Sequence, residues 1–325
     1  MHYRFRSKAV FKDLEGKIQK GCFGKLNSFL LYADHENIAE YYFNGYNANT
    51  LHEFQSVTKS LQSILVGIAL DKEYLKSIDV PIKVYFDDLP DIEWSNGKDK
   101  ITVRHLLQMT AGLDWNEGHT SYMSLQNHSN LMAWSSNWIE YALSRPMLCP
   151  PGERFIYSSA NPIIISAIFN KVYPHGHEAF ITKCLFAPLE IKRYGYHRSE
   201  SAPNILADVD ILPKDMAKIA LMLSQNGVYQ GQKLLSANWV DLMLTTKADI
   251  GKENLQYGYG WWHKYVEVLG VKYACTYAWG YGSQHIFFVK ELGLFMVCTG
   301  KNYEVTLHQG PFDLMRAVIE LAIGA

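Results

Sequence analysis

Ser56 and Lys59 have the residue types and the spacing of a nucleophile and its base. Residues three apart share a face of an α-helix, so the Lys59 amine can lie beside the Ser56 hydroxyl, and the Ser56 N–H belongs to the electropositive first turn. A serine attacks poorly until a neighbouring base takes its proton, and a lysine can take it only when burial or adjacent cations lower its pKa from about 10.4. The pair predicts attack on a carbonyl carbon, although a plain helix start with a solvated lysine has the same spacing.

The segment around this pair has the pattern of a buried helix. Between residues 56 and 70 its apolar side chains recur at the helical spacing, at Leu61, Ile64, Leu65, Ile68 and Ala69. Lys59 is the one charged residue of the segment. We therefore expect a central helix that is largely buried and that removes Lys59 from water, which is the burial that a lysine base requires.

Several other catalytic signatures are absent from the sequence. The chain contains no G-x-S-x-G, G-x-x-x-x-G-K-[ST] or H-E-x-x-H sequence and no strand-linked G-x-G-x-x-G. Their absence disfavours an ordinary α/β-hydrolase, a P-loop enzyme, a zinc protease and a Rossmann dehydrogenase. We expect a protein that uses no metal and no cofactor.

Strand-like segments stand near both ends of the chain and helical segments stand between them. The strand-like segments span residues 28–33 and 38–43, which read as a hairpin, and residues 285–289 and 293–299. The helical segments span residues 103–109, 138–143, 162–172, 214–225 and 312–323. We predict an α/β (α+β) fold in which residues 1–80 and 245–325 form an antiparallel sheet domain flanked by helices, and residues 81–244 form a mainly helical domain. The active site is expected in the cleft between them.

The composition is that of a globular protein without a polyanionic partner. Of the 325 residues 48% are hydrophobic and 19% are charged, which excludes disorder and a coiled coil. Lys plus Arg (31) nearly equals Asp plus Glu (32) with no dense basic block, so we expect no nucleic-acid partner. No apolar run approaches the roughly 18 residues of a membrane span, and the five cysteines include no C-x-x-C pair. We expect a cytoplasmic protein with reduced thiols and no membrane partner.

Four stretches of the chain, taken together and in order, form a further pattern. They read HEFQSVTKSLQSILVGIA at 52–69, ITVRHLLQMTAGLDW at 101–115, PPGERFIYSSAN at 150–161 and AWGYGSQHIFFV at 278–289. In this order they resemble the serine β-lactamase and penicillin-binding-protein superfamily, for which S-x-x-K is a signature. The resemblance is to the branch of class C β-lactamases, their esterase relatives and 6-aminohexanoate-dimer hydrolases. It implies a β-lactamase/transpeptidase-like fold.

Carried over position by position, the resemblance implies that Ser56 is the acylated nucleophile, Lys59 its proton acceptor and Tyr157 the second member of a proton relay. A phenol near an ammonium group can act as an acid or a base despite a solution pKa of about 10. The oxyanion would lie between the backbone N–H groups of Ser56 and Tyr281, the residue after the third motif. An alignment through the next glycine would move the second donor by a residue or two.

Two departures from the family pattern bear on the substrate. The Y-x-N or S-x-N triplet is Tyr157-Ser158-Ser159 in this chain, so a hydroxyl replaces a carboxamide that often contacts a substrate amide. The K-T-G triplet is Ala278-Trp279-Gly280, so the lysine is absent and Trp279 adds bulk. A cation at that position commonly recognises the carboxylate of penicillins or of peptide C-termini, so its loss weakens the antibiotic interpretation.

These observations favour a serine hydrolase that acts through an acyl-enzyme on a carboxylic ester or small amide. Its substrate would be a small molecule in contact with Ser159, Trp279 and Gly280. One alternative is a β-lactamase or D-amino-acid peptidase of the same family. Another is a penicillin-type binder that is acylated without turnover, because the sequence specifies the nucleophile better than the deacylating water. The oligomeric state stays open.

Overall fold

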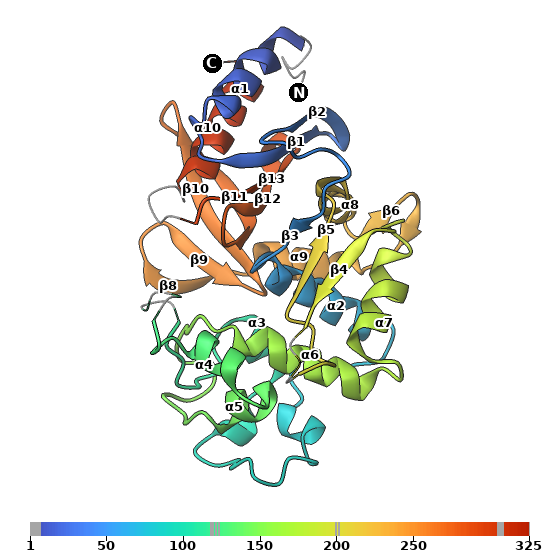
Figure 1. The fold of residues 1–325 in the computed structure, drawn as a ribbon, viewed down its shortest axis with the longest axis vertical. Coiled ribbons are helices and arrows are strands. Elements are labelled where there is room, and N and C mark those ends of the chain that lie inside the picture. The colour runs from blue at the N-terminus through green and yellow to red at the C-terminus, as the bar shows by residue number, and fades with distance from the viewer. Residues whose placement is uncertain are drawn as a thin grey trace.

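The computed structural model of the chain describes residues 8–117, 120, 122, 124–198, 200, 202–303 and 309–324. Its largest element is an eight-stranded sheet with the order β2-β1-β13-β12-β11-β10-β9-β8 (Figure 1). The strands are β1 (Leu26–Ala33), β2 (Glu36–Tyr42), β8 (Ala248–Lys252), β9 (Leu255–Gly258), β10 (Trp261–Val268), β11 (Val271–Gly280), β12 (Gln284–Val289) and β13 (Leu294–Gly300). All neighbouring strands are antiparallel, which confirms the predicted sheet from both chain ends.

The hairpin of β10 and β11 is a part of the sheet that the sequence pattern does not indicate. Leu269 and Gly270 close it with positive φ angles of 50° and 78°, as a two-residue hairpin turn requires. The first four residues of β11 are largely exposed, so this half of the strand lacks the alternation of apolar and polar residues that marks a half-buried strand. The strands that the sequence does predict lie within two residues of their expected bounds.

Helices cover both faces of the sheet. Alternate residues of β1 enter two different cores, with Phe29 and Leu31 in one and Leu30 in the other. The first core is shared with α1 (Lys8–Gln19) and α10 (Gly310–Ile323). The second is shared with α2 (Val57–Asp71), α8 (Pro213–Ser224) and α9 (Ala237–Thr245). The result is the sheet flanked by helices that the sequence predicts.

The other elements lie mostly between α2 and β8. The helices are η1 (Ile82–Tyr85), η2 (Lys98–Lys100), α3 (Val103–Leu107), α4 (His128–Trp134), α5 (Trp138–Ser144), α6 (Ala160–Val172), α7 (Gly176–Ile181), η3 (Thr182–Phe186) and, before β13, η4 (Lys290–Leu292). Two small sheets are formed by β3 (His52–Glu53), β5 (Asp208–Ile211) and β4 (Tyr194–His197), and by β6 (Val228–Tyr229) and β7 (Gln232–Lys233). The segment that we expect to be mainly helical therefore contributes strands as well. Within the described ranges, no helix has the length and apolar character needed to cross a bilayer.

α2 runs through the centre of the molecule (Figure 1). Every residue from 57 to 69 is buried, as the apolar spacing predicts. Gly67 allows α9 to approach closely, because a Cβ there would lie 2.1 Å from Cδ1 of Trp239. In the turn between β9 and β10, a Cβ on Gly260 would lie 2.7 Å from the Lys59 carbonyl oxygen, and Gly260 O accepts from Ser60 Oγ at 2.6 Å. The sheet therefore fixes the first turn of α2.

Candidate active site

The nucleophile turn (residues 54–56) precedes α2 and has a strained backbone. Gln55 has a φ of 52°, a region that costs a non-glycine residue energy and that the surrounding structure has to enforce. Asp208 at the start of β5 holds it, since its carboxylate accepts from Gln55 N–H at 2.8 Å and from Thr58 Oγ1 at 2.5 Å. The next residue, Ser56, has an ordinary φ of −65°. The small sheet thus supports the turn that presents Ser56.

Ser56 and Lys59 lie in direct contact. Lys59 Nζ donates a hydrogen bond to Ser56 Oγ at 2.9 Å. Ser56 is the N-cap residue of α2, but its side chain makes no capping hydrogen bond, so its hydroxyl is directed at the lysine. Lys59 is only 8% exposed. The structure therefore places a serine hydroxyl and a lysine amine together in a site removed from bulk water.

Tyr157 and Ser159, just before α6, reach the same lysine. Lys59 Nζ lies 4.9 Å from the centroid of the Tyr157 ring and donates to Ser159 Oγ at 3.3 Å. The segment is anchored where Ile156 N–H donates to Met109 O at 2.7 Å. The site residues taken from the first and third sequence stretches therefore converge on one amine.

The surroundings of Lys59 act on its pKa in two opposite directions. Burial lowers the pKa of Lys59, but the charges that Tyr157 and Glu117 can carry, together with a hydrogen bond to Tyr157, outweigh it. The pKa therefore lies above the ordinary 10.5. The neighbouring groups therefore favour the ammonium form of Lys59, whereas burial acts in the direction that a lysine base requires. The role of Lys59 as the proton acceptor of Ser56 stays a prediction.

Glu117 is a member of the site that the sequence motifs do not indicate. It is 2% exposed and accepts from Ser159 N–H and Ser159 Oγ at 2.7 Å each. Trp115 Nε1 donates to it at 2.7 Å and the Tyr122 hydroxyl at 2.8 Å. A single acidic residue in a loop is usually solvated, so only its place two residues after a tryptophan could have drawn attention to it.

The end of β11 lies against the nucleophile turn. A Cβ on Gly280 would lie 2.6 Å from the Phe54 carbonyl oxygen, so a glycine is needed for this approach. A Cβ on Gly282 would instead meet the ring of Tyr303, which follows β13. Tyr281 is the residue that follows the contact of Gly280 with the nucleophile turn, and the choice between the two alignments of the third motif stays a prediction.

Aromatic rings line the site on the side of the large sheet. The Trp262 ring centroid lies 5.9 Å from that of Tyr157 and 5.9 Å from that of Trp279. Ala278, where the family has a lysine, is fully buried in the core that contains α2. Neighbouring residues of a strand point to opposite faces, so Trp279 and Ala278 face different ways. The position of the missing lysine is a core position in this chain.

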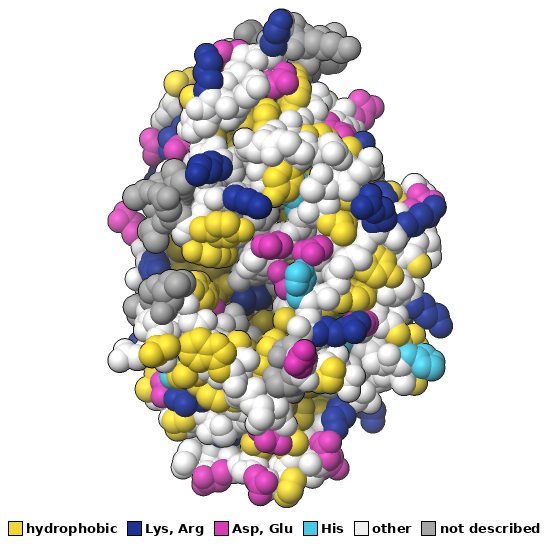
Figure 2. Space-filling view, viewed as in Figure 1, with side chains coloured by type: hydrophobic (Ala, Val, Ile, Leu, Met, Phe, Trp, Pro, Cys, Tyr) yellow, Lys and Arg dark blue, Asp and Glu magenta, His cyan; other side chains and the backbone are white. Residues whose placement is uncertain are grey.

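Tyrosines extend the aromatic surface outward. The Tyr281 ring lies 5.7 Å from that of Tyr122 and 5.1 Å from that of Tyr303, and the last two are 43% and 40% exposed. The molecule is hollowed on the face shown in Figure 2, and hydrophobic side chains gather beside the hollow. Such rings offer a binding surface to an apolar group.

Comparison with protein families gives a match over most of the chain. The family model described as Beta-lactamase matches residues 28–309. The chain belongs to the β-lactamase family. The match includes the nucleophile turn, Lys59, Tyr157, Glu117 and the end of β11.

Relatives within and around the β-lactamase family have hydrolase names. The 6-aminohexanoate-dimer hydrolase of Paenarthrobacter ureafaciens is 25% identical over 242 residues, which are 71% of this chain, and the chain spans 59% of that relative. A Bacillus anthracis structure, provisionally named a 6-aminohexanoate-dimer hydrolase, has a TM-score of 0.78 at 16% identity, covering 98% of this chain and 83% of that one. The D-stereospecific amidohydrolase of Streptomyces sp. has a TM-score of 0.70 at 15% identity, covering 98% and 99%. The structural likeness confirms the β-lactamase/transpeptidase-like fold.

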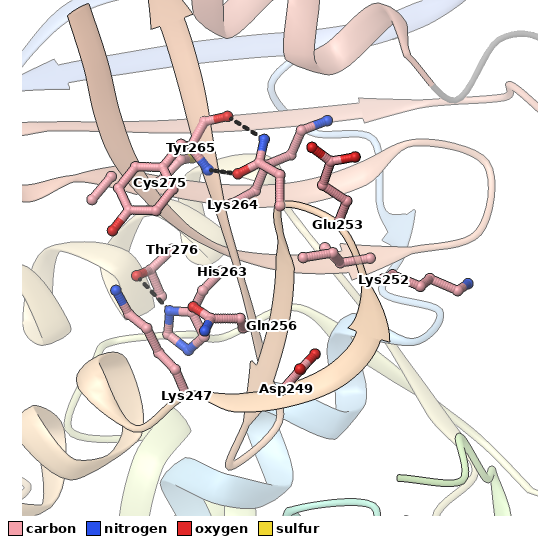
Figure 3. Close-up of a pocket in the computed structure, with 13 residues that line it drawn as sticks. Lys247, Asp249, Lys252, Glu253, Gln256, His263, Lys264, Tyr265, Cys275 and Thr276 are labelled. Carbon is pink, nitrogen blue, oxygen red and sulfur yellow. Dashed lines mark hydrogen bonds between the residues drawn. The ribbon is translucent and has the colours of Figure 1, made fainter.

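A cavity of about 380 Å³ lies elsewhere, between the β8–β9 hairpin and β10–β11 (Figure 3). His263 and Cys275 are among its lining residues and could suggest a second nucleophilic pair. However, His263 is opposite Thr276 and Lys264 is opposite Cys275, so the histidine and the cysteine point to opposite faces of the sheet. Burial also lowers the pKa of His263 to about 4 and raises that of Cys275 to about 12. The site typical of the β-lactamase family is therefore the better catalytic candidate.

Proposed function

We propose that this β-lactamase-family protein is a serine hydrolase that acts through an acyl-enzyme on carboxylic esters or small amides. The observation that supports this most directly is the 2.9 Å contact between Lys59 Nζ and Ser56 Oγ, in which the hydroxyl makes no capping bond. A hydroxyl held by a buried cation beside a helix N-terminus is prepared to lose its proton. The hydrolase names of the relatives support the same class.

The proton path of the proposed mechanism runs through Lys59, which contacts both Ser56 Oγ and the Tyr157 ring. The Lys59–Tyr157 pair, once it has released one proton to solvent, takes the proton of Ser56. Ser56 Oγ then forms a bond to the carbonyl carbon of the substrate. Lys59 stabilises the negative charge that develops on Ser56 Oγ and on the Tyr157 phenol oxygen. Tyr157 then returns the proton to the leaving oxygen or nitrogen of the substrate.

Two backbone N–H groups, those of Ser56 and Tyr281, are proposed to bind the oxyanion. Gly280 brings the strand end to the nucleophile turn, which supports this assignment. Collapse of the tetrahedral intermediate expels the alcohol or amine and leaves an ester on Ser56. Water then attacks that ester by the same steps, so the acid is released and the serine restored.

We place the substrate between the two proposed domains, with residues 1–80 and 245–325 on one side and residues 81–244 on the other. Ser56 and Gly280 come from the first part, and Tyr157, Ser159 and Glu117 from the second. The buried Ala278 offers no cation to a substrate carboxylate, whereas the rings around Trp279 suit an apolar group. Neutral short-chain esters are therefore the preferred substrates over penicillins and cephalosporins.

The experiment is a substrate panel read against Ser56→Ala. The panel contains p-nitrophenyl butyrate, nitrocefin and linear amides, and a serine-directed phosphonate reports the nucleophile by mass spectrometry. Ser56→Ala should lose labelling and turnover and stay folded, since its hydroxyl caps nothing. Ser63→Ala is the matched control, because Ser63 lies buried in the same helix, and it should keep both. Labelling that persists in Ser56→Ala would remove the proposal.

The same panel separates the alternatives. We expect kcat/KM for p-nitrophenyl butyrate to exceed that for nitrocefin by about 10³-fold or more, of which one lost charge-assisted hydrogen bond accounts for about 1.5–3 kcal/mol and crowding by Trp279 for the rest. Nitrocefin hydrolysis within tenfold of the ester would restore the β-lactamase assignment. One equivalent of product followed by no further turnover would identify a binder that is acylated and stays so.

A further inference from the structure

Glu117 lies outside the positions carried over from the family motifs, yet its carboxylate accepts four hydrogen bonds close to Lys59. Oε2 accepts from Ser159 N–H and Trp115 Nε1, and Oε1 accepts from Ser159 Oγ and the Tyr122 hydroxyl. Two donors on each oxygen occupy about all four acceptor sites of a carboxylate. Two of these donors, the backbone amide and the indole, can only donate. The arrangement is therefore that of an ionised carboxylate.

A buried charge of this kind needs a counter-charge, because removal from water is costly unless the ion is paired. Lys59 supplies it through one intermediate group. Ser159 Oγ donates to Glu117 and accepts from Lys59 Nζ, so the hydroxyl links the two charges at 2.7 Å and 3.3 Å. Where the family pattern has a carboxamide, this chain has a serine whose orientation is set by Glu117.

The other groups that face Lys59 do not make Glu117 redundant. Tyr157, Glu117 and Asp208 all raise the pKa of Lys59, against the effect of its burial. Asp208 is the first residue of β5, and its carboxylate already accepts from Gln55 and Thr58. Tyr157 changes its own charge during the proposed reaction. Glu117 is the partner whose charge can stay constant through the cycle.

We propose that Glu117 is a positioning residue of the relay, which orients Ser159 against Lys59 and keeps that lysine an ammonium group while Tyr157 exchanges protons with Ser56. The inference rests on the proposed function, because it assigns a role within that mechanism. It predicts that the carboxylate acts by charge as well as by shape.

The test is the pH dependence of Ser56 phosphonylation in Glu117→Gln. The reactive form of the Lys59–Tyr157 pair has lost one proton relative to the form at low pH. The rate of Ser56 phosphonylation therefore rises with pH, and the apparent pKa of this ascending limb of the pH–rate profile belongs to the pair as a whole. Removing a nearby negative charge makes that proton easier to lose. We expect the limb to move about one pH unit to lower pH, and the maximal rate to fall about tenfold because Ser159 loses its charged acceptor.

Two variants separate charge from shape. Tyr122→Phe removes one donor to Glu117 and leaves its charge, so the limb should stay within about 0.3 unit of wild type. Glu117→Asp keeps the charge on a shorter side chain, so its rate should fall while its limb stays in place. It serves as the second test if Glu117→Gln does not fold. A Glu117→Gln limb that coincides with wild type, or a Glu117→Asp limb displaced by a full unit, would overturn the inference.

The same measurement distinguishes this inference from the proposed function. If wild-type protein is not labelled on Ser56 at any pH, the serine hydrolase mechanism fails and Glu117 has no relay to position. If wild type is labelled and the limb is indifferent to the charge at Glu117, the hydrolase assignment stands and only the role of Glu117 is lost.

Discussion

The two sides of the site differ in the kind of groups that they present. The relay side consists of Lys59, Tyr157, Ser159 and Glu117. The sheet side consists of Trp262, Trp279, Gly280 and Tyr281. On the relay side, polar side chains bond one another and two of them are charged. On the sheet side, rings pack on rings, and the closest approach to the nucleophile turn is made by a backbone without a side chain.

This difference separates the residues that carry out the reaction from those that select the substrate. Changes on the relay side should alter rates and pH dependence with every substrate, because the proton path is common to all of them. Changes on the sheet side should act through shape and through the position of one backbone N–H. The relay side depends on electrostatics in a buried site, where each charge has a large effect, and the sheet side depends on distance.

The largest effect is expected on the relay side. Lys59→Ala and Tyr157→Phe should each lower kcat by about 10³-fold with both esters and amides, because each removes one member of the Lys59–Tyr157 pair that takes the proton of Ser56. The double variant should be far less than multiplicatively worse, since residues that act as a unit are not additive. Steady-state kinetics of the four proteins checks this. Fully multiplicative losses would mean that the two side chains serve separate steps.

A smaller loss is expected when the sheet side is moved away from the nucleophile turn. Gly280→Ala places a Cβ within 2.6 Å of the Phe54 carbonyl oxygen, so the end of β11 has to shift. Displacing one oxyanion donor should lower kcat by about 10²-fold. Tyr281→Phe is the control, because it removes the hydroxyl that donates to Tyr303 O at 2.8 Å and keeps the backbone N–H. It should lose less than threefold, and an equal loss in both variants would shift the role from backbone to side chain.

The two sides were also unequally accessible from sequence. The helix that carries Ser56 and Lys59 follows from its sequence, because its apolar residues recur at helical spacing and the segment is apolar enough to be buried on all sides. The buried Glu117 does not, since its four donors come from a loop and from a segment about 40 residues later. The groups that raise the pKa of Lys59 were hidden for the same reason, as burial was visible in the sequence and the neighbouring Tyr157 and Glu117 side chains were not.

On the sheet side, the positions of the strands along the chain were predictable from sequence, but the contacts between strand ends and the nucleophile turn were not. Strands β12 and β13 consist of buried residues and stand out as apolar runs. The positive φ of Gln55, which Asp208 supports, and the fit of Gly280 against Phe54 depend on segments more than 150 residues apart in the chain. The sequence leaves two alignments open for the third motif, and the close approach of Gly280 to Phe54 is a contact that neither alignment predicts.

The third effect is one of selection. Trp279→Ala removes a ring that packs on Trp262, 5.9 Å away, and opens the sheet side to bulkier acyl groups. The ratio of kcat/KM for nitrocefin to that for p-nitrophenyl butyrate should rise about tenfold, while the pH profile of ester hydrolysis stays as in wild type. Tyr122→Phe is a matched control that keeps an aromatic ring and should leave the ratio unchanged. A shifted pH profile in Trp279→Ala would show that the two sides are not separable.

The smallest effect on catalysis is expected at Asp208, which supports the nucleophile turn by hydrogen bonds, belongs to neither side and acts on stability. Burial raises the pKa of its carboxyl to about 7, against the lowering effect of the hydrogen bonds from Thr58, Val209 and Gln55. An unfolded chain gives an aspartate pKa of about 3.9. Between these two values the folded protein binds a proton that the unfolded chain has lost. The contribution of this group to the free energy of unfolding therefore rises as the pH falls from about 7 to about 4, and is constant above and below that window.

Asp208→Asn removes the titration and so isolates it. The difference in unfolding free energy between wild type and Asp208→Asn should shrink by about 2 kcal/mol from pH 5 to pH 8, because the wild type alone acquires a buried charge over that interval. Urea unfolding at the two pH values measures it. If Asp208→Asn is labelled on Ser56 at pH 5 at nearly the wild-type rate, Asp208 supports the turn without taking part in the relay. A difference that grows with pH would mean that the Gln55 and Thr58 hydrogen bonds favour the carboxylate over its acid, and Asp208 would then join Glu117 as a charge that the site requires.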